Sequence, residues 1–154
     1  MRKLLVFLSA LGLASALYAA DSFSGSWKLN LAKSKYEPGP APKETIITVV
    51  EGETLTDVTV TGTDENGKPF ATHLTHPTDG GPVKFVEGGP TDGSTESVKQ
   101  LNANTREITI VQGGKVVATE RISLSADGNT MQIVAKGTSS SGKPFTDVAV
   151  YERQ

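Results

Sequence analysis

The sequence predicts an all-β protein, folded as a single up-and-down antiparallel barrel of about 8–10 strands. Short runs rich in Val, Ile, Thr and Phe alternate apolar and polar residues along most of the chain, which is the period of a half-buried strand. Clusters of Gly, Asn and Asp separate these runs, and these residues accept the positive φ of tight hairpin turns. Strands joined by hairpins in this way form an antiparallel barrel or sandwich.

The beginning of the chain has a different composition. Two basic residues precede an uncharged apolar run from Leu4 to Leu17, and small residues follow, ending at Ala20. This is the pattern of a secretory signal peptide, and the run is shorter than the roughly 20 residues of a transmembrane helix. We expect residues 1–20 to be removed on export, and residues 21–154 to form one barrel domain in the periplasm or outside the cell.

Composition narrows the classes of partner. The chain has no cysteine, so an exported form has no disulfide and depends on a packed core. The formal net charge is −2 at pH 7 and no cluster of Lys and Arg occurs, which argues against nucleic-acid binding. After the first 20 residues no segment is apolar enough to enter a membrane. We expect a soluble mature chain without a nucleic-acid partner.

The first strand is predicted over Phe23–Leu31. Because side chains alternate across a pleated strand, Phe23, Trp27 and Leu29 share one face, opposite polar residues such as Lys28. A strand with this pattern lines a β core, with Trp27 pointing inward.

The segment Leu31–Pro42 lacks the strand pattern. Residues 32–36 can form one helical turn, and three prolines between Pro38 and Pro42 then enforce an extended path. We favour a structural strap across one end of the barrel, and the alternative is a gate over a ligand entrance.

The later strands follow at short intervals. They are predicted over Glu44–Val50, Thr54–Thr61, Pro69–Thr75, Pro82–Val86, Ser94–Leu101, Arg106–Val111, Lys115–Ser125, Thr130–Lys136 and Phe145–Glu152. Gly-Lys-Pro-Phe occurs twice, at residues 67–70 and 142–145, within two longer similar segments. The identical Gly-Lys-Pro-Phe pairs favour an internal duplication, and convergence on common turn chemistry is the alternative. Both predict the same three-strand unit in each half of the chain.

Two motifs resemble a known group of proteins. The run Phe23-Ser24-Gly25-Ser26-Trp27-Lys28-Leu29 resembles the opening strand of the calycins, the lipocalins and fatty-acid-binding proteins, and with the following residues it looks like a group of small secreted bacterial lipocalin-like proteins. Near the other end, Tyr151 and Glu152 match the closing strand of fatty-acid-binding proteins, but Ala149 replaces the Arg that helps hold the lipid carboxylate there. The resemblance implies a ligand-binding scaffold and not fatty-acid binding itself.

Five residues are candidate ligand contacts. Trp27, Phe70, Phe85 and Tyr151 could stack on a flat apolar ligand if they point into the barrel, although packing of the core is the alternative for each. Arg121 could replace the missing carboxylate-binding Arg, with a solvent-facing ion pair as the alternative. The sequence leaves open which way Arg106 and Asp147 face.

Catalytic chemistry has little support. The histidines, His73 and His76, are three residues apart on a strand, which places them on opposite faces and disfavours a shared metal ion. No nucleophile motif, phosphate-binding loop or calcium-binding loop occurs. We expect a non-enzymatic protein without a catalytic site, metal or cofactor.

The function predicted from the sequence is therefore a binding module for a small apolar or amphipathic ligand. A solid-core barrel that acts through its outer surface, as an inhibitor or interaction module, is the alternative, and an envelope structural protein is a third. An interior void of roughly 300 Å³ or more, lined by Trp27, Phe70 and Tyr151, would favour the binding module.

Overall fold

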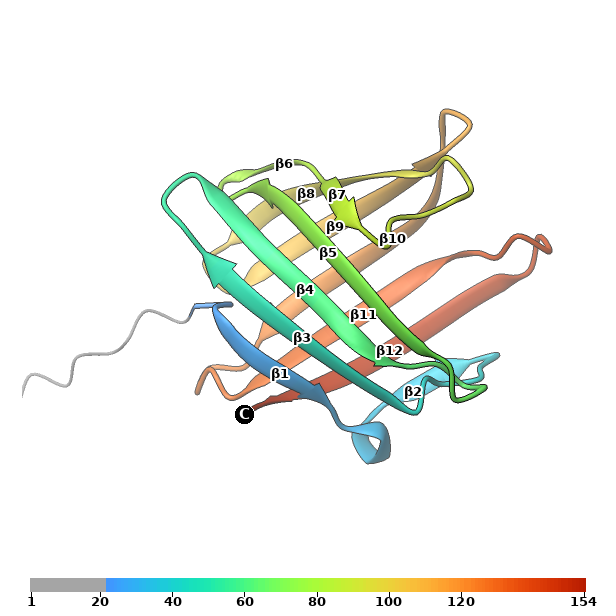
Figure 1. Ribbon diagram of the computed structural model, residues 1–154, viewed down its shortest axis with the longest axis horizontal. Coiled ribbons are helices and arrows are strands. Elements are labelled where there is room, and N and C mark those ends of the chain that lie inside the picture. Colours follow the sequence, from blue (N-terminus) through green and yellow to red (C-terminus); the bar gives the residue numbers. More distant parts are fainter. Residues whose placement is uncertain (1–21) are drawn as a thin grey trace, which may run out of the picture.

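The computed structural model describes residues 22–154, so the predicted signal peptide lies outside the described residues. Within them, the chain is an all-β, nearly closed antiparallel barrel, which confirms the predicted fold class (Figure 1). The strands in chain order are β1 (Gly25–Leu29), β2 (Lys35–Glu37), β3 (Glu44–Glu51), β4 (Leu55–Thr63), β5 (Pro69–Pro77), β6 (Gly80–Pro82), β7 (Lys84–Glu87), β8 (Thr95–Asn102), β9 (Thr105–Gln112), β10 (Lys115–Leu124), β11 (Thr130–Thr138) and β12 (Pro144–Arg153). A 3-10 turn, η1 (Leu31–Lys33), separates β1 from β2. No helix in residues 22–154 has the length and apolar character needed to cross a membrane.

The strand order follows the chain almost throughout. Strands β8 to β12 are neighbours in sequence order, β1 lies beside β12, and β3, β4 and β5 continue the sheet on the other side of β1. All of these pairings are antiparallel. The pairing of β1 with β12 joins the two ends of the folded chain, as an up-and-down barrel requires.

One predicted strand is divided in two. The segment expected as a single strand over Pro82–Val86 breaks at Val83: β6 pairs with β8, whereas β7 pairs with β5. The Val83 N–H still donates to the Glu96 carbonyl at 2.9 Å. Gly80 precedes the break with a φ of 103°, a backbone conformation that favours glycine. This divided segment, residues 80–87, forms the seam that joins the two edges of the sheet.

The proline-rich segment extends the sheet beside β12. The helical turn expected over residues 32–36 is a shorter 3-10 turn, η1, that ends at Lys33. Residues 35 and 36 lie instead in β2, an unpredicted strand that pairs with β12 on the same edge as β1. Ser34 bridges the interruption, because its hydroxyl donates to the Asn30 carbonyl at 2.7 Å and accepts from the Val150 N–H at 2.9 Å. Tyr36 packs against the core. The segment therefore has the contacts of a structural strap.

The core gathers around Trp27, which is fully buried. Its Nε1–H donates to the Phe23 carbonyl at 2.9 Å, and the Arg153 guanidinium lies 4.2 Å from its ring centroid. The inward face of β1 predicted from the alternation is thus confirmed, since Phe23 and Leu29 are buried with it. The other buried members of this cluster are Ile47, Val49, Leu124, Met131, Ala149 and Tyr151.

The repeated motif builds the same unit twice. Strands β3–β5 and β10–β12 are both three-stranded antiparallel units, as predicted. In the first, Gly62 lies opposite Phe70, and in the second, Gly137 lies opposite Phe145. The connecting turns also match. The Gly67 N–H donates to the Asp64 carbonyl, and the Gly142 N–H donates to the Ser139 carbonyl in the same way.

Candidate functional site

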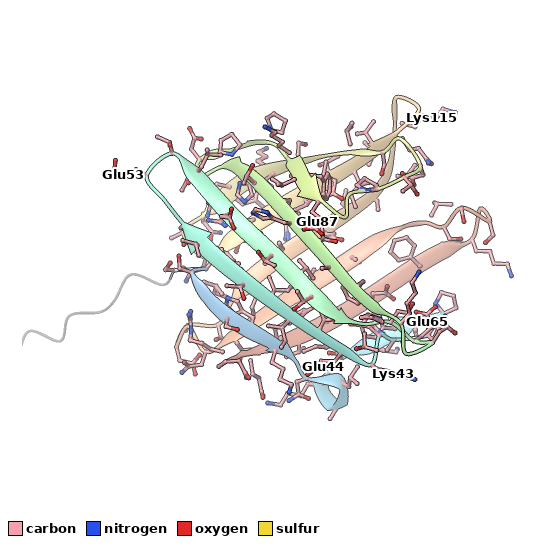
Figure 2. The ribbon with its side chains drawn as sticks, in the orientation of Figure 1. Lys43, Glu44, Glu53, Glu65, Glu87 and Lys115 are labelled. Atoms are coloured by element: carbon pink, nitrogen blue, oxygen red, sulfur yellow. The ribbon has the colours of Figure 1, made fainter. Side chains whose placement is uncertain are left out.

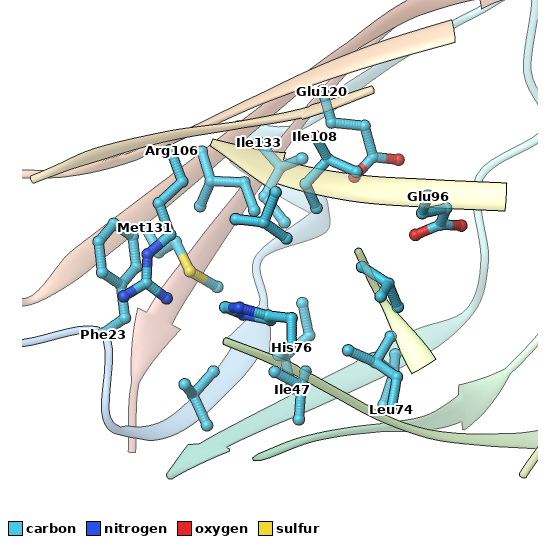
Figure 3. A pocket seen from close by; sticks show the side chains of 16 residues that line it. Phe23, Ile47, Leu74, His76, Glu96, Arg106, Ile108, Glu120, Met131 and Ile133 are labelled. Atoms are coloured by element: carbon cyan, nitrogen blue, oxygen red, sulfur yellow. The ribbon is translucent and has the colours of Figure 1, made fainter. Parts of the chain in front are cut away.

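A cavity of about 160 Å³ lies inside the barrel (Figure 3). Most of its lining is aliphatic, and the polar exceptions are one histidine, one arginine and two glutamates. The lining residues are Phe23, Ile47, Val49, Val58, Val60, Leu74, His76, Val83, Glu96, Val98, Arg106, Ile108, Glu120, Ile122, Met131 and Ile133. A cavity of about 150 Å³ with apolar walls is large enough to bind benzene. The space therefore suits a ligand with about the bulk of one aromatic ring.

Alternation along the strands creates the apolar walls. On neighbouring strands β10 and β11, Ile122 lies directly opposite Ile133, and Ile108 on β9 lies opposite Glu120. The residues between them on each strand point outward. Further charged side chains, such as Lys43, Glu53 and Lys115, are exposed at or beside the turns that connect the strands (Figure 2).

Arg106 forms one end of the cavity and its charge is compensated. The side chain is buried, forms an ion pair with Glu51, and its Nε–H donates to Gln100 at 2.7 Å. Its guanidinium also lies 4.2 Å from the Phe23 ring centroid. Burial would raise the pKa of Glu51, but hydrogen bonds from Ser22 and the nearby Arg106 charge outweigh burial and lower it. Arg106 is thus held by the protein itself.

His76 is buried beside this ion pair and lines the cavity. Its Nδ1 lies 2.7 Å from the Pro77 carbonyl, which assigns the proton to Nδ1 and leaves Nε2 as an acceptor. Burial lowers the pKa of His76, and the Arg106 charge acts in the same direction, against the Pro77 hydrogen bond. The imidazole is therefore neutral near pH 7.

Two glutamates form the other end of the cavity (Figure 3). Glu120 of β10 lies opposite Ile108, and Glu96 of β8 lies opposite Ile110, so both are farther along β9 than Arg106. Burial and then the Glu96 charge raise the pKa of Glu120 to about 7, although part of its surface stays accessible to the cavity. Burial also raises the pKa of Glu96.

The five predicted ligand contacts do not line this cavity. Trp27 and Tyr151 are buried in the core around it. Phe70 is exposed, with its ring against the backbone of Gly62, and Phe85 is half-buried on β7. Arg121 is exposed and lies 3.9 Å from Glu107. As ligand contacts these five residues stay predictions, but the cavity that the structure contains is smaller than expected and is built from other residues.

The structure shows which way Arg106 and Asp147 face, which the sequence left undecided. Arg106 points inward, and Asp147 lies opposite Tyr36, where its Oδ1 accepts from the Glu37 N–H at 3.1 Å. His76 and the two glutamates were not predicted from the sequence as site residues. For Glu120 a signal was present, because the alternation of β10 places it on the same face as the buried Leu124.

The sequence matches no protein-family model and no curated protein. Among solved structures, the chain is similar to a redesigned β barrel, with a TM-score of 0.49 and 17% identity over 88% of this chain and 95% of that one. It is also similar to a redesigned β barrel bound to DFHBI, with a TM-score of 0.39 and 13% identity over 84% of this chain and 94% of the other. Both neighbours are β-barrels.

Proposed function

We propose that this protein is an exported, non-enzymatic binding module that holds a small apolar or amphipathic molecule inside its barrel. The observation that carries the proposal is the interior cavity of about 160 Å³, which is smaller than the roughly 300 Å³ expected but has mostly aliphatic walls and polar groups at both ends. Left empty, a void of this size would cost about 4 kcal/mol relative to a filled core. A ligand that fills the void offsets this cost.

The mixed lining supports an amphipathic ligand in particular. Aliphatic side chains surround most of the cavity, and polar groups lie at both of its ends. This combination of apolar walls with a few convergent polar groups is typical of small-molecule sites. The resemblance of the opening strand to the calycins supports the same class of function.

A cavity-filling variant tests the proposal. In ¹⁵N-labelled protein, toluene should shift the amide resonances of residues that line the cavity. Val60→Phe, which places a ring in the cavity, should abolish these shifts. Val50→Phe is the matched control, because Val50 is exposed on the neighbouring strand β3. Identical spectra with and without toluene would contradict the proposal and favour a barrel that acts through its outer surface.

Export is tested on the protein in its own cell. We expect the mature chain to be recovered from the periplasm or the medium, with a mass that corresponds to cleavage after Ala20. Native mass spectrometry of the same sample would detect a retained ligand. A full-length chain confined to the cytoplasm would contradict the export part of the proposal and leave the binding part standing.

A further inference from the structure

Charge is compensated at only one end of the cavity. Arg106 is held by its ion pair with Glu51 and its hydrogen bond to Gln100. By contrast, Glu96 and Glu120 line the other end, and the side-chain carboxyl of neither has a hydrogen-bond or ion-pair partner among residues 22–154. The protein therefore places two unpartnered carboxyl groups in a cavity with mostly aliphatic walls.

We infer that the cavity selects a small primary amine with an apolar body, whose ammonium group lies against Glu120 and Glu96. This inference rests on the proposed function, because it requires that the cavity bind a ligand. The hydrocarbon part of such a molecule would contact the aliphatic walls, including Ile108 and Leu74, and one aromatic ring with an aminomethyl group suits the volume of the cavity.

Electrostatics favours a cation over an anion in this cavity. A buried carboxylate is costly unless a charged or hydrogen-bonding partner compensates it, and an ammonium group is such a partner. A ligand carboxylate would add a third negative charge beside two glutamates. Arg106 cannot offset that charge. It lies at the opposite end of the cavity and already forms an ion pair with Glu51.

The ionisation of Glu120 couples amine binding to pH. Burial and the Glu96 charge raise its pKa to about 7, so a bound ammonium group would displace its proton. Tyr151 of β12, whose pKa burial raises, also interacts with Glu120, and Tyr36 of β2 interacts in turn with Tyr151. His76 of β5 and Arg106 of β9 line the cavity as well.

The test compares benzylamine with toluene, which has nearly the same size and no charge. Wild-type protein should bind benzylamine at least about tenfold more tightly than toluene, as expected for a hydrogen bond to a charged group. Glu120→Gln should weaken benzylamine binding by about tenfold or more and leave toluene binding within about twofold. Glu107→Gln is the matched control, because Glu107 lies on neighbouring strand β9 and pairs with exposed Arg121. It should change neither affinity.

The pH dependence supplies a second readout. Benzylamine stays protonated between about pH 6 and about pH 8, so its affinity should rise across this interval as Glu120 ionises. Toluene affinity should not rise. The rise should be absent in Glu120→Gln, whereas a rise that persists in this variant would assign the effect to another group, such as His76, and count against the inference.

The outcomes separate the two proposals. If toluene binds and benzylamine binds no better, or if Glu120→Gln leaves benzylamine affinity unchanged, the amine inference is wrong and the binding module remains. If neither compound binds, the proposed function fails and the inference fails with it. Glu96→Gln gives an independent measurement if Glu120→Gln does not fold, and it should also weaken benzylamine selectively.

Discussion

Trp27 is the residue on which the interior most depends. It is fully buried, its Nε1–H donates to Phe23, and Arg153 covers its ring. Trp27→Ala empties a large buried site, and we expect it to lower the free energy of unfolding by about 3–5 kcal/mol. Denaturant melts of the mature protein measure this change.

Trp27→Phe is the matched variant for this measurement. It keeps a buried aromatic ring and removes the hydrogen bond to Phe23, so it should cost less than Trp27→Ala. A loss below about 1 kcal/mol for Trp27→Ala would contradict the central packing role of this residue.

Glu120 gives the stability of the fold a defined pH dependence. Its pKa rises from 4.5 in the unfolded chain to about 7 in the folded protein. Between these values the folded state binds more protons than the unfolded state, so the contribution of Glu120 to stability falls as pH rises. We expect Glu120→Gln to become more stable relative to wild type as pH increases from about 4.5 to about 7.

The comparison between variant and wild type isolates this effect, measured by denaturant melts across the interval. The lowered pKa of His76 acts in the opposite direction below pH 6.5, because the folded state then binds fewer protons at that site. Glu107→Gln, which changes a carboxyl paired with the exposed Arg121, is the control variant. A pH-independent difference for Glu120→Gln would contradict the placement of its carboxyl in the cavity.

At the scale of the elements, each repeated three-strand unit depends on a glycine. A Cβ at Gly62 would collide with the Glu44 carbonyl and lie 2.8 Å from the Phe70 ring, while a Cβ at Gly137 would collide with the Val117 carbonyl. Backbone on a paired strand cannot easily move away. We expect Gly62→Ala and Gly137→Ala each to destabilise the protein by about 1–3 kcal/mol in denaturant melts.

Thr61→Ala provides the comparison within the same strand. Thr61 is exposed, and its substitution should change stability by no more than about 0.5 kcal/mol. If Gly62→Ala lowered the free energy of unfolding no more than Thr61→Ala, this result would contradict the close approach of β3 and β4 at Gly62.

At the scale of the whole molecule, we expect the seam to open before the long strands of the barrel. Strand β6 has three residues and β7 has four, whereas β10, β11 and β12 have nine or ten each. Short pairings lose fewer hydrogen bonds when they open, so local opening should begin there. In native-state hydrogen exchange, we expect the amides of residues 80, 81 and 83–87 to exchange faster than those paired between β10 and β11.

The same experiment includes its own control in the repeated units. The pairings of β3 with β4 and of β10 with β11 should be protected to a similar extent, because both lie within long antiparallel ladders. Protection of the seam amides equal to that of β10 would contradict the division of the closing strand.

The fold class could be predicted because its determinants are local. Alternation of apolar and polar residues places Trp27 and Leu29 on an inward face, and turn residues such as Gly67 end the strands at hairpins. The break at Val83 could not be predicted in this way. It depends on two different strands, β5 and β8, competing for one short segment of chain.

The sequence by itself determined most of the strands, their hairpins and the repeated unit, but not β2 or the division of β6 from β7, because periodicity and turn chemistry act over a few neighbouring residues. Only the tertiary structure decided which inward residues line the cavity and which fill the core. Trp27 and Tyr151 share an inward orientation with Glu120, yet the first two are packed by surrounding strands and Glu120 borders open space. The physical reason is that free volume depends on how side chains from strands distant in the sequence meet inside the barrel, which no single strand encodes.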